Sequence, residues 1–324
     1  MELVDKMLAG DVLSLARLIS LVEREAAEVP AIMKQIYPHT GKGYNIGITG
    51  PPGAGKSTTV DKLTAHIRKT GHTVGIIAAD PSSPFTGGAV LGDRIRMQQH
   101  YLDSGVFIRS MATRGSLGGL PKTTGGVIKL LSAAGKDYTL IETVGVGQNE
   151  IDIMESADTV VVVLVPESGD TIQTMKAGLL EIADILVVNK ADRPGADSLV
   201  TELMTMLHMS SNYKDAQWQV PVLTAQAMND IGIAELLEQI EKHRAELERS
   251  GLLERERRQQ RRREFLATIE DKVTGKLLTL IAQDTKLSSF VTRVEEGKID
   301  PYSAAEEILR NGTLLADWSH QLVN

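Results

Sequence analysis

The sequence contains no cysteine among its 324 residues. Disulfide bonds and thiolate metal sites are therefore excluded, and the composition suits a reducing cytosol. Aromatic residues make up only 4% of the chain, so aliphatic side chains must build most of the core. The longest apolar run, residues 160–165, is too short to cross a bilayer, and residues 1–6 lack the features of a signal peptide. We expect a cytoplasmic protein that does not bind membranes.

The chain also has no excess of basic residues. The chain has 35 Lys and Arg against 42 Asp and Glu, a net charge of −7, which argues against general nucleic-acid binding. One arginine-rich run, residues 254–264, could be an RNA-binding arm. Glutamates interrupt this run and no aromatic residues accompany it, so a solvated or interface helix fits it better.

One motif is complete: residues 50–57 match the phosphate-binding loop G-x-x-x-x-G-K-[ST] at every fixed position. An apolar strand is predicted before it at 45–49, and a helix after it at 58–70. Small residues let backbone N–H groups surround a phosphate, and the positive end of the helix points at the same anion. Lys56 adds a cation for the β- and γ-phosphates. The predicted loop contacts are Gly50, Pro51, Pro52, Gly53, Ala54, Gly55, Lys56, Ser57 and Thr58.

The tetrapeptide Asn189-Lys190-Ala191-Asp192 follows a predicted apolar strand and indicates guanine. The Asp192 carboxylate can accept from the ring N–H and the exocyclic amine of guanine, a donor pair that adenine lacks. Asn189 can connect neighbouring loops, and the Lys190 stem can cover the face of the base. Thr224, Ala225 and Gln226 follow another predicted strand and resemble the last guanine-contacting loop of GTPases, although a plain surface loop is an alternative.

Acidic residues downstream of the phosphate loop predict a magnesium site. Asp80 and Glu142 each end a predicted strand, and Asp93 lies in the Gly-, Pro- and Ser-containing loop 81–97, which is a candidate for a segment that the γ-phosphate orders. A helix cap or a surface ion pair is the alternative for each acid taken alone. The predicted metal ligands are Ser57, Asp80, Asp93 and Glu142. The predicted catalytic groups are Lys56, Asp93, Glu142 and the N–H group of Gly145.

Strands and helices alternate from residue 44 to about 249, which predicts an α/β fold with a doubly wound, mostly parallel sheet. Strands are expected at 45–49, 74–79, 106–111, 138–142, 159–165, 185–189 and 220–224. Residues 1–40 show helical spacing, with Asp11 as an N-cap, and form a predicted N-terminal extension. Residues 41–249 form the predicted nucleotide domain. Residues 250–324 read as helices only, broken near Gly297 and Pro301.

These motifs together resemble the MeaB/MMAA/ArgK GTPases, which belong to the signal-recognition-like class of P-loop GTPases. The motifs that carry the resemblance are GPPGAGKST (50–58), AADPSSPFTGGAVLGDRIRM (78–97), ATRGSLGGL (112–120), IETVGVGQNE (141–150), PESGD (166–170) and NKAD (189–192). The resemblance implies a homodimeric GTPase that uses GTP, GDP and Mg²⁺. It also implies that the protein escorts an adenosylcobalamin-dependent acyl-CoA mutase, usually methylmalonyl-CoA mutase. In the family, residues equivalent to 166–176 act as a third switch, and the C-terminal helices help form the dimer. Thr224-Ala225-Gln226 departs from the family pattern.

Slow intrinsic hydrolysis is expected. Many GTPases place a water-orienting glutamine directly after the D-x-x-G glycine, but this chain has Val146 there, and Gln148 is a weaker candidate. A partner that orders the switch loops would then accelerate the reaction. Four arginines could supply a stabilising cation, although ion pairs suit most of them: Arg94, Arg96, Arg109 and Arg114.

A metal-insertion GTPase of the nickel-chaperone type is the alternative function, because such proteins share this fold class. They usually carry a His-rich segment or cysteine ligands, whereas the seven histidines here are dispersed. A transport-associated kinase is opposed by the guanine-type tetrapeptide. A protein-targeting GTPase would add a Met-rich domain, but the 11 methionines here are scattered.

Overall fold

The computed structural model describes residues 2–80, 97, 99–112, 120–144, 153–166, 181–209, 217–283 and 285–310. The chain forms two compact units, Met1–Glu256 and Arg257–Asn324. The first unit holds the sheet and the helices that cover it, and the second holds helices.

Seven strands form one parallel sheet in the order β3-β2-β4-β1-β5-β6-β7. The strands are β1 Tyr44–Thr49, β2 Val74–Asp80, β3 Val106–Ala112, β4 Tyr138–Glu142, β5 Thr159–Leu164, β6 Ile185–Asn189 and β7 Val222–Ala225. Every residue of β4, β5 and β6 is buried, as expected for central parallel strands covered on both faces. The predicted doubly wound parallel sheet is therefore confirmed, with strand ends within two residues of those expected.

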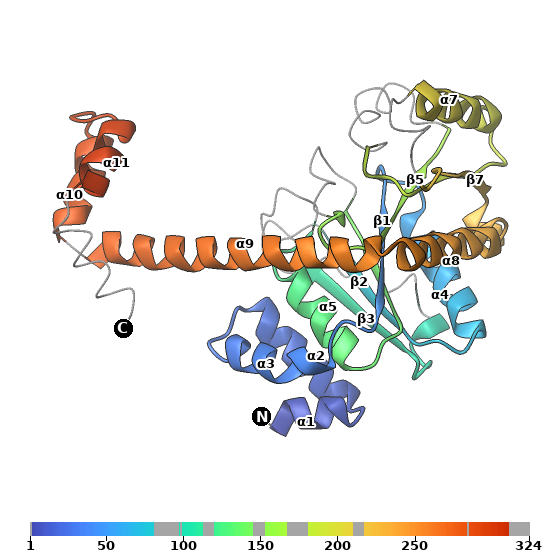
Figure 1. Cartoon of the computed structure of the whole chain (residues 1–324), viewed down its shortest axis with the longest axis horizontal. Coiled ribbons are helices and arrows are strands. Elements are labelled where there is room, and N and C mark those ends of the chain that lie inside the picture. The colour runs from blue at the N-terminus through green and yellow to red at the C-terminus, as the bar shows by residue number, and fades with distance from the viewer. Residues whose placement is uncertain are drawn as a thin grey trace. The chain divides into compact units, whose positions relative to one another are not determined.

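Helices cover both faces of this sheet because alternate strand residues point to opposite sides. Val161 and Val163 of β5 join one core cluster, together with side chains of α4 (Lys56–Lys69) and α8 (Ile233–Ser250). Val160 and Val162 join the other cluster, together with side chains of α5 (Thr124–Ala133) and α7 (Ala196–Met209). The side chains of each strand thus contribute to two apolar layers, one on each face of the sheet. Figure 1 shows this sheet with helices such as α4 and α5 beside it.

The N-terminal extension forms α1 (Glu2–Leu8), α2 (Val12–Glu23) and α3 (Val29–Ile36), followed by the short 3-10 helix η1 (Tyr37–His39). Asp11 caps α2 as predicted, with its carboxylate accepting a hydrogen bond of 2.9 Å from the Ser14 N–H. The apolar stripe of α2 packs against α5, where an added Cβ on Gly126 would lie 2.8 Å from Val22 Cγ1. Val12, the first residue of α2, does not belong to this stripe and is 55% exposed.

Helices follow the last strand to the end of the described chain. They are α8, α9 (Leu252–Gln283), α10 (Thr285–Glu295) and α11 (Pro301–Arg310), and the predicted break at Gly297 and Pro301 separates α10 from α11. The arginine-rich run lies on α9, where most of its side chains are exposed. Among the described helices, none is both long enough and apolar enough to span a bilayer.

Candidate functional site

The phosphate loop starts where β1 ends, at the carboxyl edge of the sheet. Gly50 has a φ of 137°, and a Cβ there would lie 2.0 Å from the carbonyl oxygen of Val163 in β5. Gly55 has a φ of 91°, and its Cβ would lie 2.3 Å from Asn189 Nδ2 at the end of β6. Only glycine fits both the dihedral angle and the space at these positions. The loop is therefore pressed against the ends of two neighbouring strands.

The first residues of α4 complete the loop. Gly55 is the N-cap of this helix and has no side chain with which to cap it, so the positive end of the helix dipole faces the loop. Lys56 is only 6% exposed, and its Nζ donates to the carbonyl oxygens of Gly50 at 2.9 Å and Pro51 at 3.2 Å. A buried ammonium group and a helix N-terminus thus meet at one place, which is an electrostatic environment for an anion.

An acid lies beside this cationic end of the loop. The Ser57 hydroxyl donates to Glu142 Oε1 at 2.6 Å, and both residues are buried. The contact exists because β1 and β4 are neighbours in the sheet, with Ile48 opposite Glu142. A hydroxyl and a carboxylate are oxygen ligands of the kind that Mg²⁺ prefers, so these two side chains fit a magnesium ion chemically.

Asn189 connects the phosphate loop to the segment after β7. Its Nδ2 donates to the Ala54 carbonyl at 2.8 Å, and its Oδ1 accepts from the Ala227 N–H at 3.0 Å. The side chain is buried, at 3% exposure, so both contacts are shielded from water. Lys190 follows in the left-handed region with a φ of 55°, and Asp192 is exposed at this edge. An exposed carboxylate beside the loop is accessible to a base.

The predicted third contact with the base lies next to this tetrapeptide. Ala225 pairs with Asn189 in the β6–β7 register, and Thr224 is exposed. The Gln226 amide oxygen accepts from Asn229 Nδ2 at 3.1 Å, within the 3-10 helix η4 (Ala227–Asn229) and its N-cap. The structure therefore places Thr224, Ala225 and Gln226 at the same edge as Asn189, with the Gln226 side chain already bonded to its own turn.

Several predicted residues lie outside the described part of the chain. These are Asp93, Gly145, Val146, Gln148 and most of the predicted third switch. Asp80 ends β2, but only its backbone is described. Arg109, one of the four candidate cations, forms an ion pair with Glu23 of α2 and donates to Ser20 Oγ at 3.1 Å. Among the described residues, no group of three or more His, Cys, Asp or Glu side chains could hold a metal ion.

Sequence reasoning missed one contact behind the site. Thr49 and Thr143 share a hydrogen bond of 2.9 Å, and both side chains are buried. Thr49 directly precedes Gly50 and Thr143 directly follows Glu142, so this hydrogen bond joins the start of the phosphate loop to the end of the strand that carries Glu142. Only the neighbouring positions of β1 and β4 could have indicated this pair, because the two threonines are far apart in the sequence.

Comparisons with known proteins indicate the family of this chain. The family model for the methylmalonyl Co-A mutase-associated GTPase MeaB matches residues 15–281. A relative in Pyrococcus abyssi that carries the name GTPase is 52% identical over 310 residues, covering 95% of each chain. GTPase ArgK of Escherichia coli is 35% identical over 266 residues, covering 80% of each chain. The crystal structure of an LAO/AO transport system kinase matches with a TM-score of 0.69, at 26% identity over 95% of both chains. Because the family model covers most of the chain and both relatives match over at least 80% of it, this chain is a P-loop GTPase that belongs to the MeaB family of methylmalonyl Co-A mutase-associated GTPases.

Proposed function

We propose that this GTPase binds Mg²⁺-GTP and acts as a chaperone for an adenosylcobalamin-dependent acyl-CoA mutase, with methylmalonyl-CoA mutase as its client. In this role it gates the loading of the cofactor and protects the loaded mutase. The description of the matched family supports the client. The observation that carries the nucleotide-dependent part is the buried contact between Ser57 and Glu142 beside Lys56. We place this activity in the cytoplasm, as the composition predicts.

The phosphates of GTP would lie along the loop from Gly50 to Ser57, with Lys56 turning from the loop carbonyls to the β- and γ-phosphates. Ser57 and Glu142 would hold Mg²⁺, together with Asp80 and Asp93. When bound there, the ion would supply positive charge that offsets the charge developing on the phosphates during transfer. The Gly145 N–H would donate to the γ-phosphate. The protein contributes charge and position to hydrolysis rather than covalent chemistry.

Asp192 would select guanine over adenine. Its carboxylate is exposed at the edge to which Asn189 connects the loops, so a base bound there can donate two N–H groups to it. ATP would leave this charged acceptor without donors, at a cost of about 1.5–3 kcal/mol. Hydrolysis would be slow in the isolated protein and faster when the mutase orders the switch segments.

Homodimer formation through the C-terminal helices belongs to the same proposal. Leu266, Ile269 and Val273 follow one another at helical spacing on α9 and are 53%, 44% and 47% exposed. Apolar side chains three and four residues apart lie on one helix face, which is the pattern of a helix that packs against a partner. An Ile269→Asp variant should therefore shift the protein to monomer in light scattering, whereas Asp271→Ala should leave the dimer unchanged.

A binding experiment tests the function. Titration calorimetry with GTP, GDP and ATP, with and without Mg²⁺, should detect both guanine nucleotides and little heat with ATP. Co-elution with methylmalonyl-CoA mutase should then differ between GDP and a non-hydrolysable GTP analogue. Lys56→Ala serves as the control with weakened nucleotide binding. A protein that binds guanine nucleotides but co-elutes with the mutase in neither state would be a GTPase with another client. Absence of heat with both guanine nucleotides would remove the nucleotide site.

A further inference from the structure

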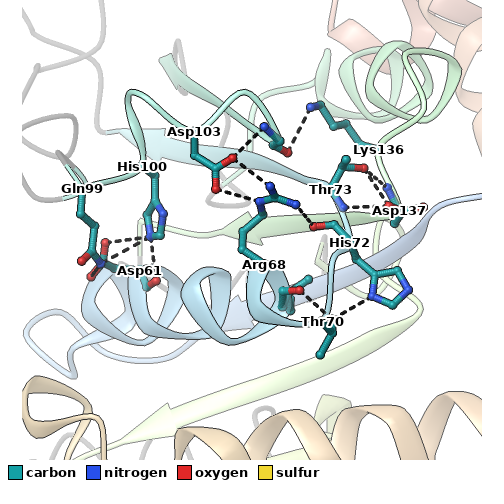
Figure 2. A network of polar contacts seen from close by, with 12 residues as sticks. Asp61, Arg68, Thr70, His72, Thr73, Gln99, His100, Asp103, Lys136 and Asp137 are labelled. Atoms are coloured by element: carbon teal, nitrogen blue, oxygen red, sulfur yellow. Dashed lines mark hydrogen bonds and ion pairs between the residues drawn. The ribbon is translucent and has the colours of Figure 1, made fainter.

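Helix α4 is bonded to segments that flank the two outermost strands of the sheet, β3 and β7. On the β3 side, the Arg68 guanidinium donates two hydrogen bonds, of 2.8 and 2.9 Å, to Asp103 in the segment that leads into this strand. Figure 2 shows this pair beside α4, together with the contacts of Asp61 with Gln99 and His100. One side of α4 is thus fastened to the segment before β3.

A different pair fastens α4 on the β7 side. His66 Nε2 lies 2.8 Å from Asp230 Oδ1, and the two side chains are 18% and 41% exposed. Asp230 is the C-cap of η4 and has a φ of 58°, in the left-handed region. Aspartate is one of the few residues with a side chain that adopt this region readily. Asp230 therefore supplies both the turn conformation and the carboxylate that reaches α4.

Residues 226–231, which we call the η4 turn, form a closed unit. Gln226 and Ile231 exchange backbone hydrogen bonds, of 3.0 Å from the Gln226 N–H and 3.3 Å from the Ile231 N–H. Gly232 follows with a φ of 79°, and a Cβ there would lie 2.3 Å from the carbonyl oxygen of Thr224 in β7. The turn is therefore held close to the end of its own strand and moves as one piece.

The η4 turn also contacts the edge proposed to bind guanine. The Ala227 N–H donates to Asn189 Oδ1 at 3.0 Å, and Asn189 Nδ2 donates to the Ala54 carbonyl in the phosphate loop at 2.8 Å. Gln226, a proposed base contact, is the first residue of the turn. Ala227 is buried in the same apolar cluster as Leu63 of α4. A shift of the turn along α4 would therefore displace Gln226 and the partner of Asn189 together.

The His66–Asp230 pair is suited to positioning rather than to stability. A pair this exposed contributes little to the free energy of unfolding. The apolar contacts of Ala227 are not directional and would let the turn slide on α4, whereas a hydrogen bond selects one position.

We propose that His66 and Asp230 are positioning residues for guanine. Their contact holds the η4 turn at one place on α4, the helix whose first turn would bind the phosphates. The pair thereby sets where the base contacts lie relative to the phosphate contacts. This inference rests on the proposed binding of guanine nucleotides, and it adds a specificity-determining contact that lies outside the phosphate loop and the tetrapeptide.

Competition titrations against a fluorescent GDP analogue test the pair by measuring GDP and ADP affinities. In His66→Ala and Asp230→Gly, we expect GDP affinity to fall about threefold, the scale of one half-exposed pair. Glycine keeps the left-handed conformation, so this change removes only the carboxylate. ADP affinity should stay at the wild-type value, because it depends on the phosphate contacts. The double variant should lose no more than either single one, since both remove the same contact.

Asp230→Asn serves as the conservative variant, because asparagine also tolerates a positive φ and keeps an acceptor oxygen. It should hold GDP affinity within about twofold of the wild-type value.

Asp103→Asn is the matched control. It weakens a pair on the same helix that leads to β3, the outer strand opposite β7. It should lower thermal stability and leave the preference for GDP over ADP unchanged, with each variant checked for folding by circular dichroism. The proposal is overturned if folded His66→Ala and Asp230→Gly keep the wild-type preference, or if Asp103→Asn reduces it equally. A wild-type protein with no preference for GDP would instead refute the proposed function on which the pair rests.

Discussion

The carboxyl and amino edges of the same sheet carry polar groups of different kinds. The carboxyl edge carries the phosphate loop, which contains glycines with positive φ and leads into the N-terminus of α4 with its buried Lys56. At the amino edge, side chains hydrogen-bond to one another: the Tyr44 hydroxyl lies 2.6 Å from Thr159 Oγ1, which lies 2.8 Å from His243 Nδ1. Asp184 joins them, with Oδ1 3.6 Å from His243 Nε2 and Oδ2 accepting from the Val160 N–H at 2.7 Å.

This difference assigns ligand binding to one edge of the sheet and a contribution to folding stability to the other edge. The amino edge uses its donors and acceptors internally, where α8 contributes His243 and Arg244, and the Arg244 guanidinium lies 5.1 Å from the centre of the Tyr44 ring. The carboxyl edge combines positive charge with a backbone shape that only glycine permits. Substitutions at the carboxyl edge should therefore change ligand binding, and substitutions at the amino edge should change the free energy of unfolding.

Gly50→Ala should have the largest effect, because this substitution at the carboxyl edge should change both GTP binding and the free energy of unfolding. An added Cβ would lie 2.0 Å from the Val163 carbonyl oxygen and overlap it, so we expect the free energy of unfolding to fall by about 4 kcal/mol. We also expect this variant to lose GTP binding. Gly53→Ala is the matched control: its φ of 75° is also positive, but no atom lies within 4 Å of its added Cβ. It should cost about 1 kcal/mol. Equal losses in urea denaturation would contradict the steric explanation.

Lys56→Ala should sharpen the comparison. Removing the buried ammonium group should lower GTP affinity by about 3 kcal/mol, roughly 100-fold, because a charged hydrogen bond to phosphate is lost. The sheet and its core contacts should remain, so circular dichroism and the unfolding midpoint should change little. The control is Lys69→Ala, an exposed position at the other end of α4, which should keep wild-type affinity in calorimetry.

Asp192→Asn tests the base end of the carboxyl edge. We expect GTP to lose about 2 kcal/mol of its preference over ATP, because the amide offers only one acceptor oxygen to the two guanine donors. The exposed position predicts a change in unfolding free energy below about 0.5 kcal/mol. Competition titrations with both nucleotides measure the preference, and an unchanged ratio would reject the assigned role of Asp192.

Tyr44→Phe is the corresponding test at the amino edge. It removes the hydroxyl bonded to Thr159 and should cost about 1 kcal/mol of unfolding free energy, while GTP affinity stays at the wild-type value. Tyr37→Phe, at a residue that is 57% exposed on η1, should change neither quantity. A loss of GTP affinity in Tyr44→Phe would mean that the two edges are coupled.

The smallest expected effect is the pH dependence of the unfolding free energy in the wild-type protein, where two opposite contributions offset each other. Burial raises the pKa of Asp184 to about 7 and lowers the pKa of His243 to about 4. Between these values the native Asp184 holds a proton that the unfolded chain releases, which lowers stability as the pH rises. The native His243 lacks a proton that the unfolded chain binds below its ordinary pKa of about 6.5, which raises stability as the pH rises. The two contributions oppose each other.

Single substitutions should expose these opposite slopes. In Asp184→Asn only the histidine contribution remains, so the unfolding free energy should rise between pH 4 and 6.5. In His243→Gln only the aspartate contribution remains, so the unfolding free energy should fall as the pH rises toward about 7. Urea denaturation at a series of pH values measures both slopes. Two variants with the same pH profile would refute this account of the pair.

Local patterns predicted much of the molecule. The apolar runs indicated seven strands, and the phosphate loop was recognisable because glycine spacing and the start of a helix are properties of neighbouring residues. The Asp11 cap was predictable for the same reason, since a capping side chain bonds to a residue three positions away. Family motifs then indicated guanine and the GTPase class.

The sequence by itself thus determined the parallel α/β class, and it predicted the loop proposed to bind the phosphates and the tetrapeptide proposed to select guanine. Only the tertiary structure decided which distant residues meet: Ser57 contacts Glu142 across 85 positions, Asn189 contacts Ala54 across 135, and Gln99 contacts Asp61 across 38. The physical reason is that these contacts depend on the order β3-β2-β4-β1-β5-β6-β7 and on how connections return over the helices. That order is selected by burying both faces of the whole sheet, which no local stretch of sequence encodes.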